Sequence, residues 1–289
     1  MELRLLKYFL VLVQERNISR AAEVLHLTQP TLSRQMAQLE EELGAPLFVR
    51  GKNIVLTEAG FMLRRRAEEV TSLVDKIEDE FANKDQVGGV ISIGSGGLNS
   101  FRALPVIMES FRKLYPKVSF KIYSNSAEYV VEQLEQGILD FGLLLEPVDV
   151  SKFEYVRMKA HERWGLMVRS GNPLTRKKYI TKEDLLNETL VCSGRQNIQG
   201  EIRAWLGDSV ERLDIIATHN LVTSTIMLVE AGVASALLLE GAVDLYDPAR
   251  LVFRPLYPEL RMTSVFAWKK VQTGFGAAGK FLDHFKSML

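Results

Sequence analysis

The 289-residue chain carries 36 basic and 36 acidic side chains, so its formal net charge near pH 7 is zero, and 47% of its residues are hydrophobic. These values are typical of a globular protein with two or more cores and exclude a disordered chain. The apolar residues near the amino terminus are interrupted by charged ones, and no apolar run is long enough to span a membrane. We therefore expect a cytoplasmic protein without a membrane partner. The single cysteine, Cys192, excludes an intrachain disulfide, a thiolate-rich metal site and a two-cysteine redox switch.

The first predicted feature is a pair of helices joined by a tight turn between residues 18 and 44. We expect Ser19 to cap the first helix, whose small residues Ala21 and Ala22 allow a neighbouring helix to approach closely. We expect Thr28 to cap the second helix, with Pro30 in its first turn, where a missing N–H costs nothing. The buried face of this second helix is predicted to consist of Leu32, Met36, Leu39 and Leu43.

The other face of the second helix is polar and therefore free to bind. Side chains of this kind near a helix amino terminus can bond base edges and phosphates of DNA. The helix pair alone is equally consistent with an ordinary helical hairpin whose polar face is solvated. Two short strands, residues 47–50 and 53–57, follow it and predict a hairpin wing with Arg50 and Lys52 at its tip.

The distribution of charge favours the DNA interpretation. Residues 1–66 carry ten basic and seven acidic side chains, whereas residues 67–87 carry two and seven. The zero net charge therefore conceals a basic head and an acidic connector. The residues that we expect to contact DNA are Ser19, Thr28, Gln29, Pro30, Thr31, Ser33, Arg34, Gln38, Arg50 and Lys52.

One long helix is predicted over residues 58–82, with Thr57 as its cap. Its apolar residues recur at alternating spacings of four and three, which is the a/d spacing of a coiled coil. The residues of this seam are Leu63, Ala67, Val70, Val74, Ile77 and Phe81. We expect them to form a homodimer interface; the alternative is a single helix packed on its own domain. Residues 83–89, which end in two glycines, indicate a hinge.

From residue 90 the pattern is an alternation of strands and helices, which predicts α/β architecture with parallel sheets. In the first set we expect strands at 90–94, 118–123 and 140–145 and helices at 101–114 and 128–136. The second set comprises strands at 154–156, 165–168, 190–192, 214–217 and 236–239 and helices at 201–206 and 221–231. A strand at 263–268 and a last helix complete the chain.

Polar residues follow several of these strands, at the edge where open parallel sheets bind ligands. We expect them to form a donor-rich pocket for a small polar ligand, with a carboxylate as one candidate. The expected pocket residues are Ser95, Gly96, Asn99, Ser100, Asn125, Ser126, Ser193, Asn197, Thr218, His219 and Asn220. The alternative is that each of these residues only caps its own helix. Arg195, on one of the same loops, could pair with an anion, but a lone loop arginine is more often solvated.

Motifs for catalysis or cofactors are missing from the sequence. The segment Gly94–Gly97 lacks the third glycine of a dinucleotide fingerprint and the lysine of a phosphate loop. The four histidines do not form a cluster with metal-ligand spacing. We therefore expect no cofactor, no metal and no enzymatic activity.

The head resembles the amino-terminal domain of LysR-type transcriptional regulators. The residues that carry the resemblance are Phe9, Ala21–Ala22, Thr28–Pro30, Leu32–Ser33, Leu39–Glu40, Leu43–Gly44, Leu47–Phe48, Arg50 and Leu56–Gly60. A weaker similarity to the effector domain of that family includes Leu104–Pro105, Phe111, Tyr115–Pro116, Leu134, Gly137, Asp140, Leu228–Gly232 and Ala236–Leu238. The resemblance covers essentially the whole chain.

This resemblance implies an order of domains. It implies a winged helix-turn-helix domain (1–57), a dimerisation linker helix (58–82), a hinge (83–89) and an effector-binding domain (90–289). The last would comprise two α/β subdomains, 90–147 with 261–289 and 148–260, like a periplasmic solute-binding protein with a cleft between them. The chain would cross between them near Pro147 and Leu260.

The resemblance also implies a function: a homodimer or dimer of dimers that binds promoter DNA, responds to a small-molecule effector in the cleft and, as an activator, contacts RNA polymerase. A second interpretation is a cytoplasmic small-molecule binding protein or enzyme whose amino-terminal head only oligomerises. An oligomerisation head would bury an apolar surface where this chain presents Gln29, Ser33 and Arg34.

Overall fold

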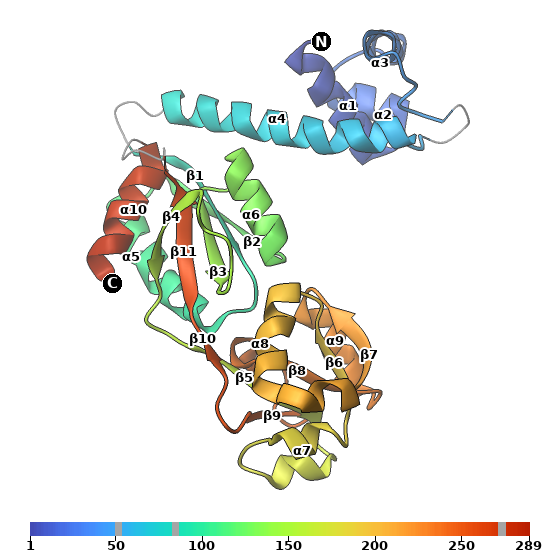
Figure 1. Ribbon diagram of the computed structural model, residues 1–289. Helices are drawn as coiled ribbons and strands as arrows, with labels where there is room; N and C mark the ends of the chain where they lie inside the picture. The colour runs from blue at the N-terminus through green and yellow to red at the C-terminus, as the bar shows by residue number, and fades with distance from the viewer. Residues whose placement is uncertain (50–53, 83–86, 271–275) are drawn as a thin grey trace. The chain divides into compact units, whose positions relative to one another are not determined.

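The computed structural model describes residues 1–49, 54–82, 87–270 and 276–289. The chain divides into two units, residues 1–82 and 83–289 (Figure 1). Arg50 and Lys52, at the predicted wing tip, lie outside the described residues. Within these residues no helix is both long enough and apolar enough to cross a membrane.

The first unit is helical. Its helices are α1 (Leu3–Glu15), α2 (Ile18–Val24), α3 (Gln29–Leu43) and α4 (Glu58–Ala82). One core joins all four, because apolar residues at helical spacing face one another. Phe9 of α1, Ala21 of α2, Leu32 of α3 and Ala67 of α4 are completely buried in it. The bounds of α4 are those predicted from the sequence.

The second unit contains two sheets. The first has the order β2-β1-β3-β11-β4 and the second has the order β10-β5-β8-β6-β7, with β9 beside β5. The strands of the first sheet are β1 (Gly89–Ser95), β2 (Val118–Ser124), β3 (Phe141–Leu145), β4 (Phe153–Arg157) and β11 (Ser264–Lys269). Those of the second are β5 (Glu162–Arg169), β6 (Thr189–Ser193), β7 (Asp214–His219), β8 (Ser235–Leu239), β9 (Leu251–Pro255) and β10 (Arg261–Met262).

Helices cover both faces of each sheet. They are η1 (Asn99–Ala103), α5 (Leu104–Leu114), α6 (Ala127–Gln136), η2 (Pro173–Arg176), α7 (Lys182–Leu185), α8 (Gln196–Leu206), η3 (Gly207–Arg212), α9 (Val222–Glu230), η4 (Glu240–Leu245) and α10 (Gly276–Met288). In Figure 1, α5 and α10 lie on one face of the first sheet and α6 on the other. In β3, Leu143 packs in the core that includes α5 and α10, whereas Leu144 packs with α6. Gly142 lets α6 approach closely, because an added Cβ would lie 2.6 Å from a methyl carbon of Leu134.

The fold class predicted from the sequence is confirmed, and the parallel pairings of β1 with β2 and β3 and of β6 with β7 and β8 are present. The sheets are mixed and not wholly parallel as predicted, because β11 runs antiparallel to β3 and β4, and β5 runs antiparallel to β8, β9 and β10. The crossing predicted near Pro147 was placed too early, because β4 still pairs with β11 in the first sheet. The chain therefore passes to the second subdomain between Arg157 and Glu162. It returns at Thr263, between β10 of the second sheet and β11 of the first, close to the crossing predicted near Leu260.

Candidate functional site

The helix pair α2–α3 has the caps that such a pair requires, with one difference from prediction. The cap of α2 is Asn17, whose Oδ1 accepts a hydrogen bond from the backbone N–H of Arg20 at 3.0 Å. Ser19 therefore lies in the first turn and does not cap the helix. Thr28 caps α3 as predicted, with a backbone N–H to Oγ1 distance of 3.4 Å from Thr31, and Pro30 occupies the first turn.

The polar face of α3 is exposed along its length. The predicted contact residues of this face and of α2 are all exposed: Ser19, Thr28, Gln29, Pro30, Thr31, Ser33, Arg34 and Gln38. The side chain of Gln38 donates to Glu42 at 3.0 Å. Leu43, predicted to be buried, is 40% exposed, because α3 ends there and Gly44 turns the chain away with a φ of 67°. The helix thus presents an unobstructed polar surface over its first three turns.

Glu40 has a structural role in the head that its sequence pattern did not predict. One of its carboxylate oxygens accepts the backbone N–H groups of Leu47 at 2.6 Å and Phe48 at 3.2 Å. Phe48 forms an antiparallel bridge with Leu56. Glu40 therefore fixes the base of the predicted wing to α3.

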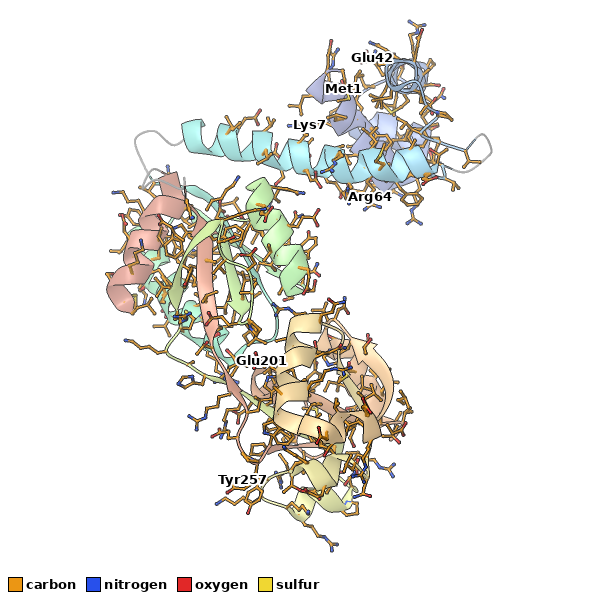
Figure 2. The ribbon with its side chains drawn as sticks, in the orientation of Figure 1. Met1, Lys7, Glu42, Arg64, Glu201 and Tyr257 are labelled. Atoms are coloured by element: carbon orange, nitrogen blue, oxygen red, sulfur yellow. The ribbon has the colours of Figure 1, made fainter. Side chains whose placement is uncertain are left out.

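Only part of the predicted apolar seam of the linker helix α4 is buried against the rest of the first unit. Leu63 and Ala67 are buried in the head core. Lys7 of α1, labelled in Figure 2, pairs with Asp75 of α4 at 3.2 Å. Val70 and Ile77 are 42% and 54% exposed. Leu73, outside the predicted seam, is also exposed. The side chain of Phe81 lies outside the described residues, and Val74 is half-buried.

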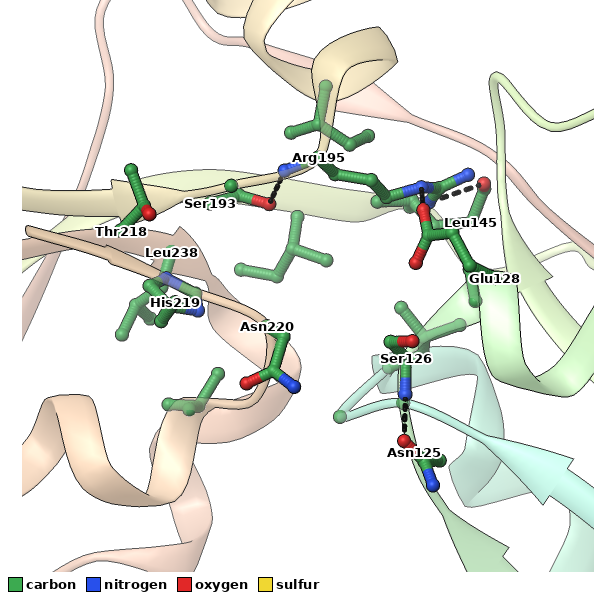
Figure 3. A pocket seen from close by; sticks show the side chains of 18 of the residues that line it. Asn125, Ser126, Glu128, Leu145, Ser193, Arg195, Thr218, His219, Asn220 and Leu238 are labelled. Carbon is green, nitrogen blue, oxygen red and sulfur yellow. Dashed lines mark hydrogen bonds and ion pairs between the residues drawn. The ribbon is translucent and has the colours of Figure 1, made fainter. Parts of the chain in front are cut away.

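The second unit contains a cavity of about 750 Å³ between its two sheets (Figure 3). Of the predicted pocket residues, those that line it are Gly96, Asn125, Ser126, Ser193, Thr218, His219 and Asn220. An apolar wall that the sequence did not predict completes it: Leu98, Leu143, Leu145, Trp164, Ile198, Val222, Leu238 and Leu239. Both subdomains thus contribute polar strand ends to one cleft.

Ser95, Asn99 and Ser100 do not line this cleft. Glu162, completely buried at the start of β5, accepts the backbone N–H groups of Asn99 at 2.7 Å and Ser100 at 2.9 Å. Ser95 Oγ donates to the carbonyl of Gly96, and Ser100 Oγ bonds Ser264 Oγ at 2.8 Å. These groups are therefore satisfied within the protein. The side chain of Asn197 lies outside the described residues.

One residue of the cleft, Ser126, also caps a helix, as the alternative interpretation expected. Ser126 Oγ accepts the N–H of Tyr129 at 3.4 Å and so caps α6. Asn125 and Asn220 each accept the N–H of the next residue. The two roles are compatible, because the hydroxyl of Ser126 keeps its proton free to donate into the cavity.

Arg195 and His219 are a cationic and a titratable side chain that line the cleft. Arg195, expected to be solvated, is only 15% exposed and forms an ion pair with Glu128 at 3.0 Å. Burial lowers the pKa of Arg195, and the neighbouring carboxylate opposes that shift. Both ring nitrogens of His219 are buried without a hydrogen-bond partner among the described residues. Burial lowers the pKa of His219 against an opposing interaction with the backbone of Leu237, and the lowered pKa keeps the imidazole neutral near pH 7.

Cys192 and the possible metal ligands add no further site. Cys192 is 5% exposed, and burial raises the pKa of its thiol, which makes it less reactive. Within the described ranges, histidine, cysteine, aspartate and glutamate residues nowhere gather in a group of three that could hold a metal ion.

Comparisons with known proteins agree with this geometry. Residues 3–61 match the family described as "Bacterial regulatory helix-turn-helix protein, lysR family", and residues 84–289 match the "LysR substrate binding domain". The Hca operon transcriptional activator HcaR of Escherichia coli K12 is 29% identical over 279 residues, which cover 93% of this chain and 92% of HcaR. The regulator AlsR of Bacillus subtilis is 32% identical over 199 residues, 68% of this chain and 65% of AlsR.

Solved structures show the same fold. The LysR family transcriptional regulator CbnR has a TM-score of 0.79 at 23% identity, with coverage of 100% of this chain and 99% of CbnR. CbnR has also been solved in complex with its target DNA, and that structure has a TM-score of 0.77 at 24% identity over the full length of both chains.

Proposed function

The chain belongs to the LysR family of bacterial transcriptional regulators, and we propose that a small polar effector, bound in the cleft, controls its action at a promoter. It is a DNA-binding regulator with an effector-binding domain. The observation that carries the proposal is the cavity of about 750 Å³, whose polar lining comes from both subdomains and includes Ser126 and His219. A ligand that contacts both walls binds one arrangement of the subdomains better than another, which is the physical requirement for control.

The DNA contacts are assigned to α3 and the wing. Gln29, Ser33 and Arg34 lie on the exposed face of α3 and are placed to read bases or adjacent phosphates. Arg50 and Lys52 are assigned to the phosphate backbone from the sequence alone.

Self-association is assigned to α4. Val70, Leu73 and Ile77 form an exposed apolar stripe with helical spacing. Exposure of such a stripe to water is unfavourable, and a second copy of the chain would bury it. A homodimer, or a dimer of dimers, would present two heads to a twofold DNA site. If the protein activates transcription, RNA polymerase is a further partner, and all of these interactions belong in the cytoplasm.

The competing function is a small-molecule binding protein or enzyme with an oligomerisation head. Its head would bury α3, whereas this α3 exposes glutamine, serine and arginine over its first turns. The cleft offers hydrogen-bonding groups and an ion pair, and we assign it to binding without catalysis.

A gel shift with DNA from upstream of the chain's own gene tests the proposal. We expect specific retention, and we expect a ligand found by thermal-shift screening to alter the complex. Ser126→Ala and Asn220→Ala each remove one polar group from one wall, so each should cost about 0.5 to 3 kcal/mol of ligand affinity. DNA affinity without ligand should stay unchanged in both. If both variants retain full affinity, the cleft is not the effector site.

A further inference from the structure

Arg195 lines the cleft and connects the two subdomains through hydrogen bonds and an ion pair. It belongs to the second subdomain, on the loop between β6 and α8. Its guanidinium donates to the carbonyl oxygens of Leu145 at 3.3 Å and Pro147 at 3.0 Å. Its Nε lies 3.0 Å from Glu128 Oε1 in the first turn of α6, and Figure 3 shows Arg195 beside Glu128 and Leu145. All three partners belong to the first subdomain.

These partners hold Arg195 unequally. The two carbonyls are fixed by the end of β3 and the chain after it, whereas the Glu128 side chain is 63% exposed and contacts Arg195 through Nε. A guanidinium has five N–H donors in a planar fork that fits a carboxylate through two parallel bonds. Glu128 contacts Nε and does not form this pair of parallel bonds. A ligand carboxylate inside the cavity that formed both bonds would therefore bind the guanidinium more strongly than Glu128 does. Glu128 can then return to water at little cost, because it is already largely exposed.

The rest of the cavity indicates what the carboxylate would be attached to. Leu143, Trp164, Ile198 and Leu238 line it with apolar surface, and its volume of about 750 Å³ exceeds that of a simple ion. His219 also lines the cavity, and burial keeps its imidazole neutral near pH 7. This combination of one cation, a neutral imidazole and an apolar wall fits an amphipathic anion.

We propose that the cleft binds a carboxylate with an apolar body and that the ligand's carboxylate replaces that of Glu128 on the guanidinium of Arg195. The inference rests on the proposed role of the cleft as the effector site. Glu128 is then a competitor of the ligand, so removing Glu128 strengthens binding and removing Arg195 weakens it. An ion pair with only a structural role would give losses, or no effect, at both positions.

Three carboxylates of increasing size test this idea on the full chain: acetate, cyclohexanecarboxylate and naphthalene-2-carboxylate, each beside its neutral amide. Binding is measured by calorimetry and by tryptophan fluorescence, because Trp164 lies in the cleft wall and is only 2% exposed. We expect the two larger acids to bind and their amides to bind at least about tenfold more weakly, since an amide lacks the charge that Arg195 pairs with.

Substitutions of Glu128 and Arg195 should change the affinity for the acids in opposite directions. Glu128→Gln should raise acid affinity about threefold to tenfold, and Arg195→Gln should lower it at least about tenfold, with Arg195→Lys between wild type and Arg195→Gln. Glu135→Gln is the matched control, because it removes the same charge from the same helix, pairs with Lys152 at 2.9 Å and does not line this cavity. It should leave affinity within about twofold. Thermal melting of each variant checks that it is folded.

Three results would overturn the exchange: no acid binds, acids and amides bind alike, or Glu128→Gln fails to strengthen binding while Arg195→Gln weakens it. Failure of the cleft as an effector site looks different. If the acids bind with the expected signs yet never alter the gel shift, the anion site stands and the regulatory role is wrong. If an uncharged ligand acts through the cleft independently of Arg195, the regulatory role stands and the exchange is wrong.

Discussion

His219 is a half-buried histidine of the second unit whose pKa differs from the ordinary histidine value. Both ring nitrogens are buried and have no hydrogen-bond partner by geometry among the described residues, although the residue lines the cavity. Protonation would place an unpaired charge there, which is why burial lowers the pKa of this imidazole.

The free energy of unfolding should depend on His219 below neutral pH. Because its pKa is lower in the folded state, the unfolded chain binds more protons in the range just below the ordinary histidine pKa, and stability falls as pH falls through that range. Urea denaturation between about pH 7.5 and pH 5.5 should show a smaller loss for His219→Gln than for wild type. His161→Gln, at an exposed histidine, is the control. Equal losses in wild type and His219→Gln would contradict the prediction.

Arg34 is the residue of α3 with the greatest capacity to discriminate bases. Arg34→Ala should cost about 1 to 3 kcal/mol in specific binding if its exposed guanidinium reads a guanine. Fluorescence anisotropy with the promoter fragment and with a scrambled duplex measures both affinities. The control is Arg20→Ala. It removes an arginine of α2 that pairs with Glu15 at 2.7 Å. An equal loss on both duplexes would indicate a phosphate contact instead.

Residues were predictable where the chemistry is local and unpredictable where it depends on distant partners. Thr28 caps α3 through a residue three positions away, a relation that the sequence displays directly. Glu162 takes the N–H groups of Asn99 and Ser100 from more than sixty positions away, so those two polar residues looked free. Arg195 looked solvated for the same reason, because Glu128 and Leu145 reach it only through the fold.

At the scale of elements, α4 divides its apolar residues between two tasks. Leu63 and Ala67 complete the head core, and Val70, Leu73 and Ile77 remain exposed. The heptad spacing predicted one seam, but it could not show that α1 covers the first part of it. The remaining stripe is the surface that we assign to the dimer.

Val70→Asp and Ile77→Asp should dissociate the dimer, because an unpaired carboxylate in an apolar seam costs several kcal/mol. Sedimentation velocity should show the mass of one chain for each variant, and the gel shift should weaken as the paired heads are lost. Val24→Asp introduces the same charge at a valine of α2 that is 51% exposed, and it should keep the dimer mass. Dimer mass in both linker variants would place the interface elsewhere.

Long periodic elements were predicted well and short ones were missed. The bounds of α4 match, and most strands with buried apolar runs lie within one or two residues of prediction, whereas β5 begins three residues earlier than predicted. The strands β9 and β10 were missed: β10 has only two residues, and the β9 sequence contains Arg254 and Pro255. Strand β4 was found but assigned to the wrong subdomain, because strand order depends on pairing with β11, more than a hundred residues away.

At the scale of the whole molecule, the chain crosses twice between the two sheets of the second unit, so neither subdomain is a continuous segment. Their apolar residues nevertheless form one connected core that includes Leu166 of the second sheet and Phe266 of the first. We therefore expect residues 83–289 to fold without the head, as the division of the chain into two units also indicates.

The isolated fragment 83–289 should melt cooperatively, and a cleft ligand should raise its melting temperature by mass action. At a hundredfold excess over Kd, binding stabilises the folded state by about 2.7 kcal/mol. For a fragment of this size, that corresponds to a shift of about 5 to 10 °C. Differential scanning fluorimetry on the fragment and on the full chain measures this shift in melting temperature. Arg195→Gln is the binding-deficient comparison. The control is the surface variant Glu109→Gln, which disrupts a pair with Lys113. A shift seen in the full chain and absent from the fragment would place the ligand in residues 1–82, because the fragment contains every residue that lines the cleft.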